Sequence, residues 1–190
     1  MRATGFLAMF LVLASAPAFA HAGAGAAGGF LHGLMHPLTG LDHVLAVVAV
    51  GLWAGLVGSK ARIAYPVAFG SMMTLAGAWG MSGGELPGVE IGIAFSVVIL
   101  GAAVALKASP PLAAGTLACG ILAIFHGFAH GAELPETASG LAYALGFILA
   151  TAALHLAGIM LAGAIATRAP LVTRIAGGGL VLAGVAFLAG

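Results

Sequence analysis

Residues 138–166 read ASGLAYALGFILATAALHLAGIMLAGAIA and contain no Asp, Glu, Lys or Arg. A helix needs about 20 apolar residues to cross roughly 30 Å of hydrocarbon, so this stretch can span a bilayer and must tilt or protrude. Five similar stretches accompany it, separated by Gly, Pro, Ser and charged residues of the kind found in turns. The six predicted spans are residues 39–58, 62–81, 89–107, 111–131, 138–166 and 171–190. The sequence therefore predicts an all-α membrane protein, with one six-transmembrane-helix bundle over residues 21–190.

The composition supports this fold class. The chain has 190 residues, of which 62% are hydrophobic and 6% are charged, whereas a soluble domain carries about 25% charged residues. Such a chain cannot cover a water-facing surface, which excludes a soluble globular domain. The formal net charge of +1 excludes a nucleic-acid-binding protein, because such proteins carry a basic patch. The one cysteine, Cys119, excludes an internal disulfide and a CxxC metal site.

Residues 1–20, MRATGFLAMFLVLASAPAFA, have the features of a cleavable signal peptide. Arg2 gives a positive start, residues 5–13 form a short apolar run, and Ala18-Phe19-Ala20 is an A-x-A cleavage site. We expect cleavage before His21, which places the mature N-terminus outside the cytoplasm. The alternative is an uncleaved first membrane helix, which the shortness of the apolar run disfavours.

The distribution of charge predicts the orientation. With the mature N-terminus outside, all the Lys and Arg residues of the mature chain fall on the cytoplasmic side, as the positive-inside rule requires. These residues are Lys60, Arg62, Lys107, Arg168 and Arg174. We therefore expect a multi-pass protein of the bacterial inner membrane with both mature termini in the periplasm. Glu85, Glu90 and Glu136 are then expected to be solvated charges at loops and helix ends.

Ionisable side chains gather at the ends of two predicted spans. Because such side chains are costly within a membrane, each of them predicts a function. One cluster lies where the first span begins and the other where the fourth span ends, so both lie at the outer face. His126 and His130 are four residues apart and share a helix face, which Glu133 continues. The predicted site residues are His36, Asp42, His43, His126, His130 and Glu133.

These residue types predict a metal site. Imidazole binds Ni, Zn, Cu and Fe, and a carboxylate adds an oxygen ligand and a compensating negative charge. Each carboxylate could bind the ion directly or orient an imidazole, and the spacing leaves both roles open. Pro37 predicts an entry turn, with Thr39 and Asp42 arranged as a capping box. His36 would then fold back over Asp42 and His43, after an interfacial or re-entrant piece at residues 28–36.

Four further residues are weaker candidates for metal binding or for the pathway of an ion. His32 lies four residues before His36, and His21 would combine an imidazole with a free amine after cleavage. Cys119 lies two helical turns before His126, and His155 lies deeper in the fifth span. A packing role is the alternative for Cys119 and for His155, which has Thr151 one turn away. The glycine pairs Gly51/Gly55 and Gly127/Gly131 predict close helix packing.

Two motifs carry a resemblance to a known family. Residues 36–43, HPLTGLDH, have the form H-x5-D-H, and residues 125–133, FHGFAHGAE, have the form F-H-G-x-A-H-G-x-E. Together they resemble the signatures of the HupE/UreJ family, and the signal peptide and the six-span plan are also similar. The resemblance covers the whole chain. It implies nickel uptake that supplies hydrogenases or ureases, with cobalt for some members, and it carries the six predicted site residues over to this chain.

The combined interpretation is a secondary transporter that takes up Ni²⁺, or alternatively Co²⁺, from the periplasm. The ion is the cargo, and no permanently bound cofactor is expected. The expected partners are a divalent metal ion and the lipid bilayer, while a homo-oligomer and a metallochaperone partner stay open. One alternative is a membrane metalloenzyme with a fixed Zn or Fe ion and an open position for water. The other is an accessory protein that binds metal without transporting it.

Overall fold

The computed structural model describes residues 26–133, 140–165 and 170–190, and within them the chain is helical with no β-strand. The elements are α2 (Ala26–Met35), the 3-10 helix η1 (His36–Leu38), α3 (Leu41–Val57), α4 (Ala61–Met81), α5 (Val89–Ala105), α6 (Leu112–Ala132), α7 (Gly140–Ile165) and α8 (Pro170–Ala189). Helices α3 to α8 correspond to the six predicted spans, and their ends lie within two residues of the predicted ends. The predicted signal peptide and His21 lie outside the described residues.

The helices have the surface of a membrane protein. Large apolar side chains are exposed along them, such as Ile63 at 71%, Leu141 at 75% and Leu182 at 72%, which is unusual for a protein dissolved in water. By length and composition, three of the described helices can cross a bilayer, namely Leu112–Ala132, Gly140–Ile165 and Leu171–Ala189. The bent pair formed by α2 with η1 and α3 makes a fourth candidate. Helix α5, with 17 residues, is about 26 Å long and just short of the hydrocarbon thickness.

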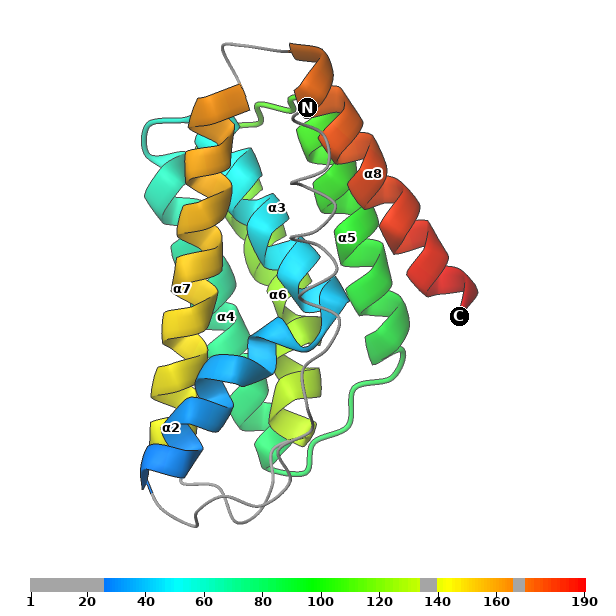
Figure 1. Ribbon diagram of the computed structural model, residues 1–190. Coiled ribbons are helices and arrows are strands. Elements are labelled where there is room, and N and C mark those ends of the chain that lie inside the picture. The colour runs from blue at the N-terminus through cyan, green and yellow to red at the C-terminus, as the bar shows by residue number, and fades with distance from the viewer. Residues whose placement is uncertain (1–25, 134–139, 166–169) are drawn as a thin grey trace, which may run out of the picture.

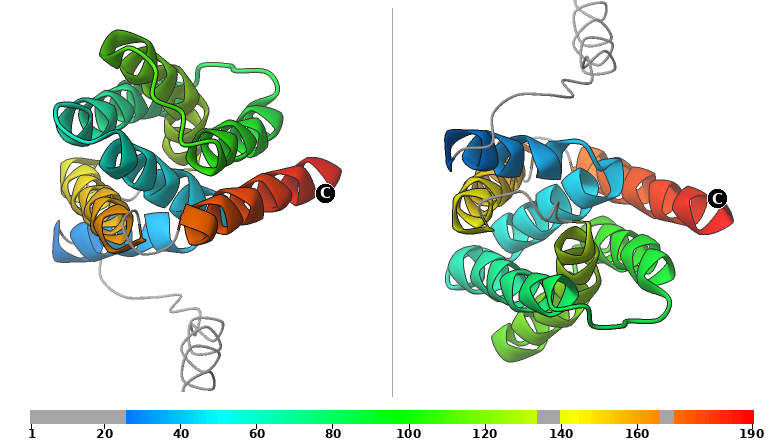
Figure 2. Two further views of the ribbon diagram at one scale, coloured as in Figure 1. Left: turned by 90° about the horizontal axis from the view of Figure 1, so that it is seen from above. Right: turned by 90° about the horizontal axis from the view of Figure 1, so that it is seen from below.

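Helix α3 lies in the middle of the bundle. It packs against α4, α5 and α7, while α6 packs against α4 and α5, and α8 packs on α5. The views along the bundle in Figure 2 show this arrangement, with α3 enclosed by its neighbours. Helix α2 lies against α7 at the end of the bundle where α7 begins (Figure 1). The described chain therefore brings the start of α3 close to the ends of helices that are distant in sequence.

Glycines bring the backbones of these helices together, as the sequence predicted. A side chain at Gly127 or Gly131 of α6 would collide with the backbone of Met73 or Gly77 of α4. A side chain at Gly51 of α3 would likewise collide with the backbone of α7 at His155. Without a driving force from water, membrane helices associate through such close contacts of small residues. The glycine pairs fix the position of α6 against α4 and of α7 against α3.

The chain bends by 79° between residues 29–38 and α3. The interfacial or re-entrant piece expected at residues 28–36 coincides with helix α2, whose helical form was not predicted, and Pro37 lies in the η1 turn before α3. The predicted capping box is wrong. Gly40 is the residue that precedes α3, and the Thr39 hydroxyl donates a hydrogen bond of 2.7 Å to the carbonyl oxygen of His36. Thr39 therefore closes the η1 turn that carries His36 and does not cap α3.

Candidate metal centre

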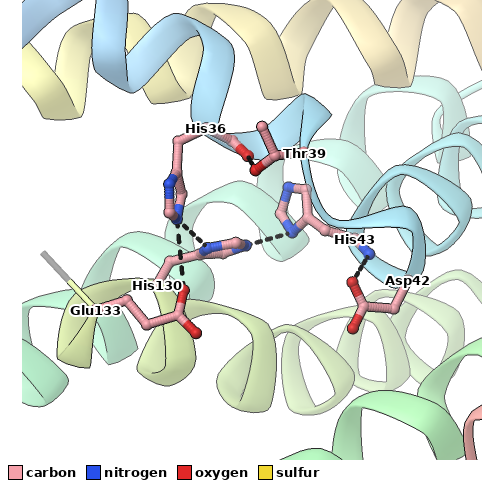
Figure 3. A network of polar contacts seen from close by, with 6 residues as sticks. All are labelled: His36, Thr39, Asp42, His43, His130 and Glu133. Atoms are coloured by element: carbon pink, nitrogen blue, oxygen red, sulfur yellow. Dashed lines mark hydrogen bonds and ion pairs between the residues drawn. The ribbon is translucent and has the colours of Figure 1, made fainter. Parts of the chain in front are cut away.

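The two predicted clusters meet at the bend between α2 and α3. His36 comes from η1, Asp42 and His43 come from the first turn of α3, and His130 and Glu133 come from the C-terminal end of α6. Figure 3 shows His130 pointing from α6 between the side chains of His36 and His43. The 79° bend makes this possible, because it turns η1 across the end of α6 and places His36 on the other side of the His130 ring.

Three imidazoles form a continuous chain of polar contacts. His36 Nε2 lies 3.0 Å from His130 Nδ1, and His130 Nε2 lies 2.9 Å from His43 Nδ1. His130 therefore uses both ring nitrogens and separates His36 from His43, so the prediction that His36 folds back over Asp42 and His43 is wrong. The ring of Phe147 packs edge-on against His130, with 4.9 Å between the ring centroids. The aromatic contact fixes the plane of the central imidazole.

The geometry at His36, His130 and Glu133 fits a divalent cation. These three residues each offer one ligand atom, and the three atoms lie within 4.8 Å of one another. Two nitrogens that bind one ion at about 2.1 Å with a right angle between them are about 3.0 Å apart, which is the distance from His36 Nε2 to His130 Nδ1. Glu133 Oε2 lies 3.6 Å from His36 Nε2, and the Glu133 side chain is 61% exposed. A small movement of this carboxylate would complete the ligand set.

Asp42 and His126 occupy different positions around this centre. Asp42 Oδ1 accepts a hydrogen bond of 2.6 Å from the backbone N–H of His43, so the carboxylate fixes the first turn of α3. His126 is 1% exposed, and its Nε2 lies 2.7 Å from the hydroxyl of Ser96 in α5. The rings of His126 and His43 are 5.6 Å apart. Asp42 and His126 thus both border the centre, and neither contacts His36 directly.

All six predicted site residues line one cavity of about 200 Å³. The same cavity is lined by Glu90, which is exposed and lies in the first turn of α5. The position of Glu90 in the sequence predicted only a solvated charge, because sequence spacing cannot show that α5 begins beside the end of α6. No Lys or Arg of the described residues lines this cavity, whereas the carboxylates of Asp42, Glu90 and Glu133 do. Three carboxylates without a positive neighbour favour the binding of a cation.

The weaker candidates are separated from one another. His32 is exposed, and its ring centroid lies 5.9 Å from that of His36, at the edge of the centre. Cys119 is fully buried and lines neither this cavity nor the one beside α7. His155 is 4% exposed and lines a second cavity of about 430 Å³ between α4 and α7, which also contains Arg62. The expected contact between His155 and Thr151 is absent, since His155 Nε2 and Thr151 Oγ1 both lack a hydrogen-bond partner in the part of the chain that the structure describes.

Comparison with known proteins identifies relatives of this chain. The family model described as HupE / UreJ protein matches residues 8–187. A curated relative from Rhizobium leguminosarum bv. viciae, described as Protein HupE, is 46% identical over 176 residues, which cover 92% of each chain. No solved structure matches the chain. The similarity thus extends over both clusters and over the helices that hold them.

Proposed function

The chain belongs to the HupE/UreJ family, and on that premise we propose that it is a secondary transporter that takes up Ni²⁺, with Co²⁺ as the other candidate. Family membership implies a nickel or cobalt permease-type accessory role in the membrane and not an enzyme. More specifically, we propose that the ion enters from the periplasm through a site between α3 and α6. The ion is the cargo, and the recipient is a metalloenzyme under maturation.

The observation that carries this proposal is the 3.0 Å separation of His36 Nε2 and His130 Nδ1 beside the carboxylate of Glu133. Without an ion, two imidazole nitrogens at this distance must share one proton. With a divalent ion, both nitrogens bind through their lone pairs, so the proton between them must leave this contact and move to the other nitrogen of its own ring. A divalent cation enters a membrane protein when ligands replace its water and negative charge offsets its own. The proposed ligands are His36, His130 and Glu133, with His43, Asp42 and His126 around them.

We further propose that α3 to α8 are six spans behind a cleaved signal peptide, residues 1–20. Helices α3 and α5 are short for membrane spans. They would cross the bilayer in the part of the bundle whose outer end is covered by α2 and η1. In this topology the metal centre faces the periplasm, both mature termini are periplasmic, and Lys60, Arg62, Lys107 and Arg174 lie on the cytoplasmic side of the inner membrane. The membrane potential then favours entry of a divalent ion by about 4.6 kcal/mol per 100 mV.

The proposed inward path runs along the seam between α4 and α7. A third cavity, of about 250 Å³, is lined by His130 and also by Met73, Thr74 and Ile148. The same three residues line the 430 Å³ cavity that contains His155 and Arg62. His130 thus borders both the metal centre and the seam. We propose that rearrangement of α4 and α7 lets the ion pass from His130 to His155, and that Cys119 is a packing residue.

Uptake of ⁶³Ni²⁺ into liposomes that contain this protein alone tests the proposal. Wild-type protein should accumulate nickel under an inside-negative potential. Glu133→Gln removes one proposed ligand charge and should raise the KM for nickel about 10-fold or more. Glu85→Gln removes a charge from an exposed residue that does not line the cavity, so its KM should match that of the wild type.

The same assay separates the alternatives. Binding of nickel without accumulation would overturn transport and support an accessory protein that holds the metal. Equal KM values for Glu133→Gln and Glu85→Gln would overturn the assigned site even if the wild type transports nickel.

A further inference from the structure

Ser96 in α5 makes two hydrogen bonds with one hydroxyl group. This side chain is fully buried, and its Oγ lies 2.7 Å from the carbonyl oxygen of Ile93 in the preceding turn. The same Oγ lies 2.7 Å from Nε2 of His126 in α6. No sequence motif marks Ser96, because its partner lies 30 positions further along the chain.

Proton counting assigns the direction of both hydrogen bonds. A serine hydroxyl has one proton to donate, while a backbone carbonyl can only accept. The Ser96 proton therefore goes to Ile93 O, and the Ser96 oxygen must accept from His126. Nε2 of His126 then carries the N–H. In the neutral imidazole that a metal ion requires, the lone pair is on Nδ1.

We propose that Ser96 is a positioning residue that holds His126 as the Nε2–H tautomer and so presents Nδ1 to the cation. The inference rests on the proposed function, because it treats His126 as one of the residues that meet the ion in the 200 Å³ cavity of the metal centre, which His126 lines. The ring of Phe69 lies 5.8 Å from that of His126 and packs against it from the side of α4. Ser96 thus determines which ring nitrogen of His126 carries the proton, and packing against Phe69 holds the orientation of the ring.

Loss of the hydroxyl removes the one acceptor that selects this tautomer. In Ser96→Ala, Nε2–H of His126 would be buried without a partner, which is costly. The imidazole then gains by moving its proton to Nδ1, which blocks the nitrogen that would meet the ion. Replacing a residue that orients a metal-binding histidine typically lowers metal affinity 10-fold to 100-fold. Ser96→Thr keeps the hydroxyl and should restore both the tautomer and the affinity.

The experiment is long-range ¹H–¹⁵N NMR of the full chain labelled with ¹⁵N-histidine in detergent, together with nickel binding to the same samples. The His126 signals are identified by their loss in His126→Gln. Wild type and Ser96→Thr should show a protonated Nε2 and an unprotonated Nδ1. Ser96→Ala should shift toward the other tautomer and bind nickel about 10-fold or more weakly.

A matched control is Ser82→Ala. The Ser82 hydroxyl also donates a 2.7 Å bond to a carbonyl three residues earlier, that of Trp79, and among the described residues no imidazole is hydrogen-bonded to it. This variant should leave the His126 tautomer and nickel affinity unchanged. An unprotonated Nε2 in the wild type, or the same tautomer in Ser96→Ala as in the wild type, would overturn the proposal. A shifted tautomer with unchanged nickel affinity would also overturn it. Nickel binding without uptake by the wild type would instead reject transport and leave the role of Ser96 intact.

Discussion

His36 Nε2 and His130 Nδ1 lie 3.0 Å apart, although 94 positions separate them in the chain. The contact depends on two features of the backbone. The bend before α3 turns η1 across the bundle, and the glycines of α6 let that helix lie directly on α4. A ligand pair held by packing in this way needs little rearrangement to accept an ion, which lowers the free-energy cost of binding.

His130 is the central residue of the imidazole chain, so its loss should affect nickel binding most. His130→Ala removes a proposed ligand and breaks the contacts to both His36 and His43. We expect nickel affinity to fall at least about 100-fold, beyond the range typical for residues that only orient a ligand. His32→Ala is the control, since His32 is exposed at the edge of the centre, and should change affinity less than about 3-fold. Isothermal titration calorimetry in detergent measures both, and equal losses would contradict the central role of His130.

The Asp42 carboxylate combines a structural and an electrostatic role, which two substitutions separate. Asp42→Asn keeps an oxygen that can accept the N–H of His43 but removes the negative charge. Asp42→Ala removes both. We expect both variants to lose nickel affinity by about 10-fold or more, whereas only Asp42→Ala should lower the unfolding temperature, because it loses the hydrogen bond that fixes the first turn of α3. Wild-type affinity in Asp42→Asn would show that the charge of Asp42 does not act on the ion.

Much of the fold could be predicted from the sequence, because membrane helices are defined by local composition. Uninterrupted apolar stretches and the Gly and Pro residues between them are local signals, and α3 to α8 begin and end close to the predicted positions. The glycine pairs Gly51/Gly55 and Gly127/Gly131 also pack as predicted, since a glycine in an apolar helix has few other uses. An entry turn at Pro37 and a short piece before the first span were expected, but the helical form of α2 was not predicted.

The arrangement of side chains within the centre could not be predicted in the same way. Periodicity places His126, His130 and Glu133 on one helix face, but it does not show which helix that face meets. The insertion of His130 between His36 and His43, the position of Glu90 on the cavity and the bond from Ser96 to His126 all depend on how α5, α6 and η1 approach one another. The Thr39 capping box failed for a related reason. Gly40, and not Thr39, precedes α3, so the Thr39 oxygen accepts no N–H of that helix, and the hydroxyl instead donates to the carbonyl of His36 in the η1 turn.

The packing of α6 on α4 predicts a sharp difference between two glycine substitutions. In Gly127→Ala the added methyl group would collide with the Met73 carbonyl, whereas at Gly70 of α4 no heavy atom lies within 4 Å of the added methyl group. Forcing an extra carbon into a packed interface costs about 1–3 kcal/mol. Gly127→Ala should therefore lower the free energy of unfolding by about that amount, and Gly70→Ala should leave it unchanged. Unfolding in mixed detergent micelles measures both, and equal stabilities would show that α4 and α6 are not held this closely.

The two candidates for the inward path should behave differently. His155 lines the seam between α4 and α7, whereas Cys119 is buried outside it. His155→Ala should slow nickel uptake into liposomes several-fold and leave equilibrium nickel binding unchanged, because the outer ligands are intact. Cys119→Ala should retain both properties. A wild-type uptake rate in His155→Ala would remove His155 from the path, and a slow rate in Cys119→Ala would assign the path to α6.

The proposed topology can be tested with single reporter cysteines, because the native Cys119 is fully buried and should not react. Ser82 follows α4 at the end nearest the metal centre, and Ser59 lies between α3 and α4 at the opposite end, and both residues are exposed. If the centre faces the periplasm, a membrane-impermeant maleimide added to spheroplasts should label Ser82→Cys and not Ser59→Cys. Disruption of the membrane should make Ser59→Cys reactive as well. The reverse labelling pattern would place the metal centre on the cytoplasmic side and turn the proposed uptake into export.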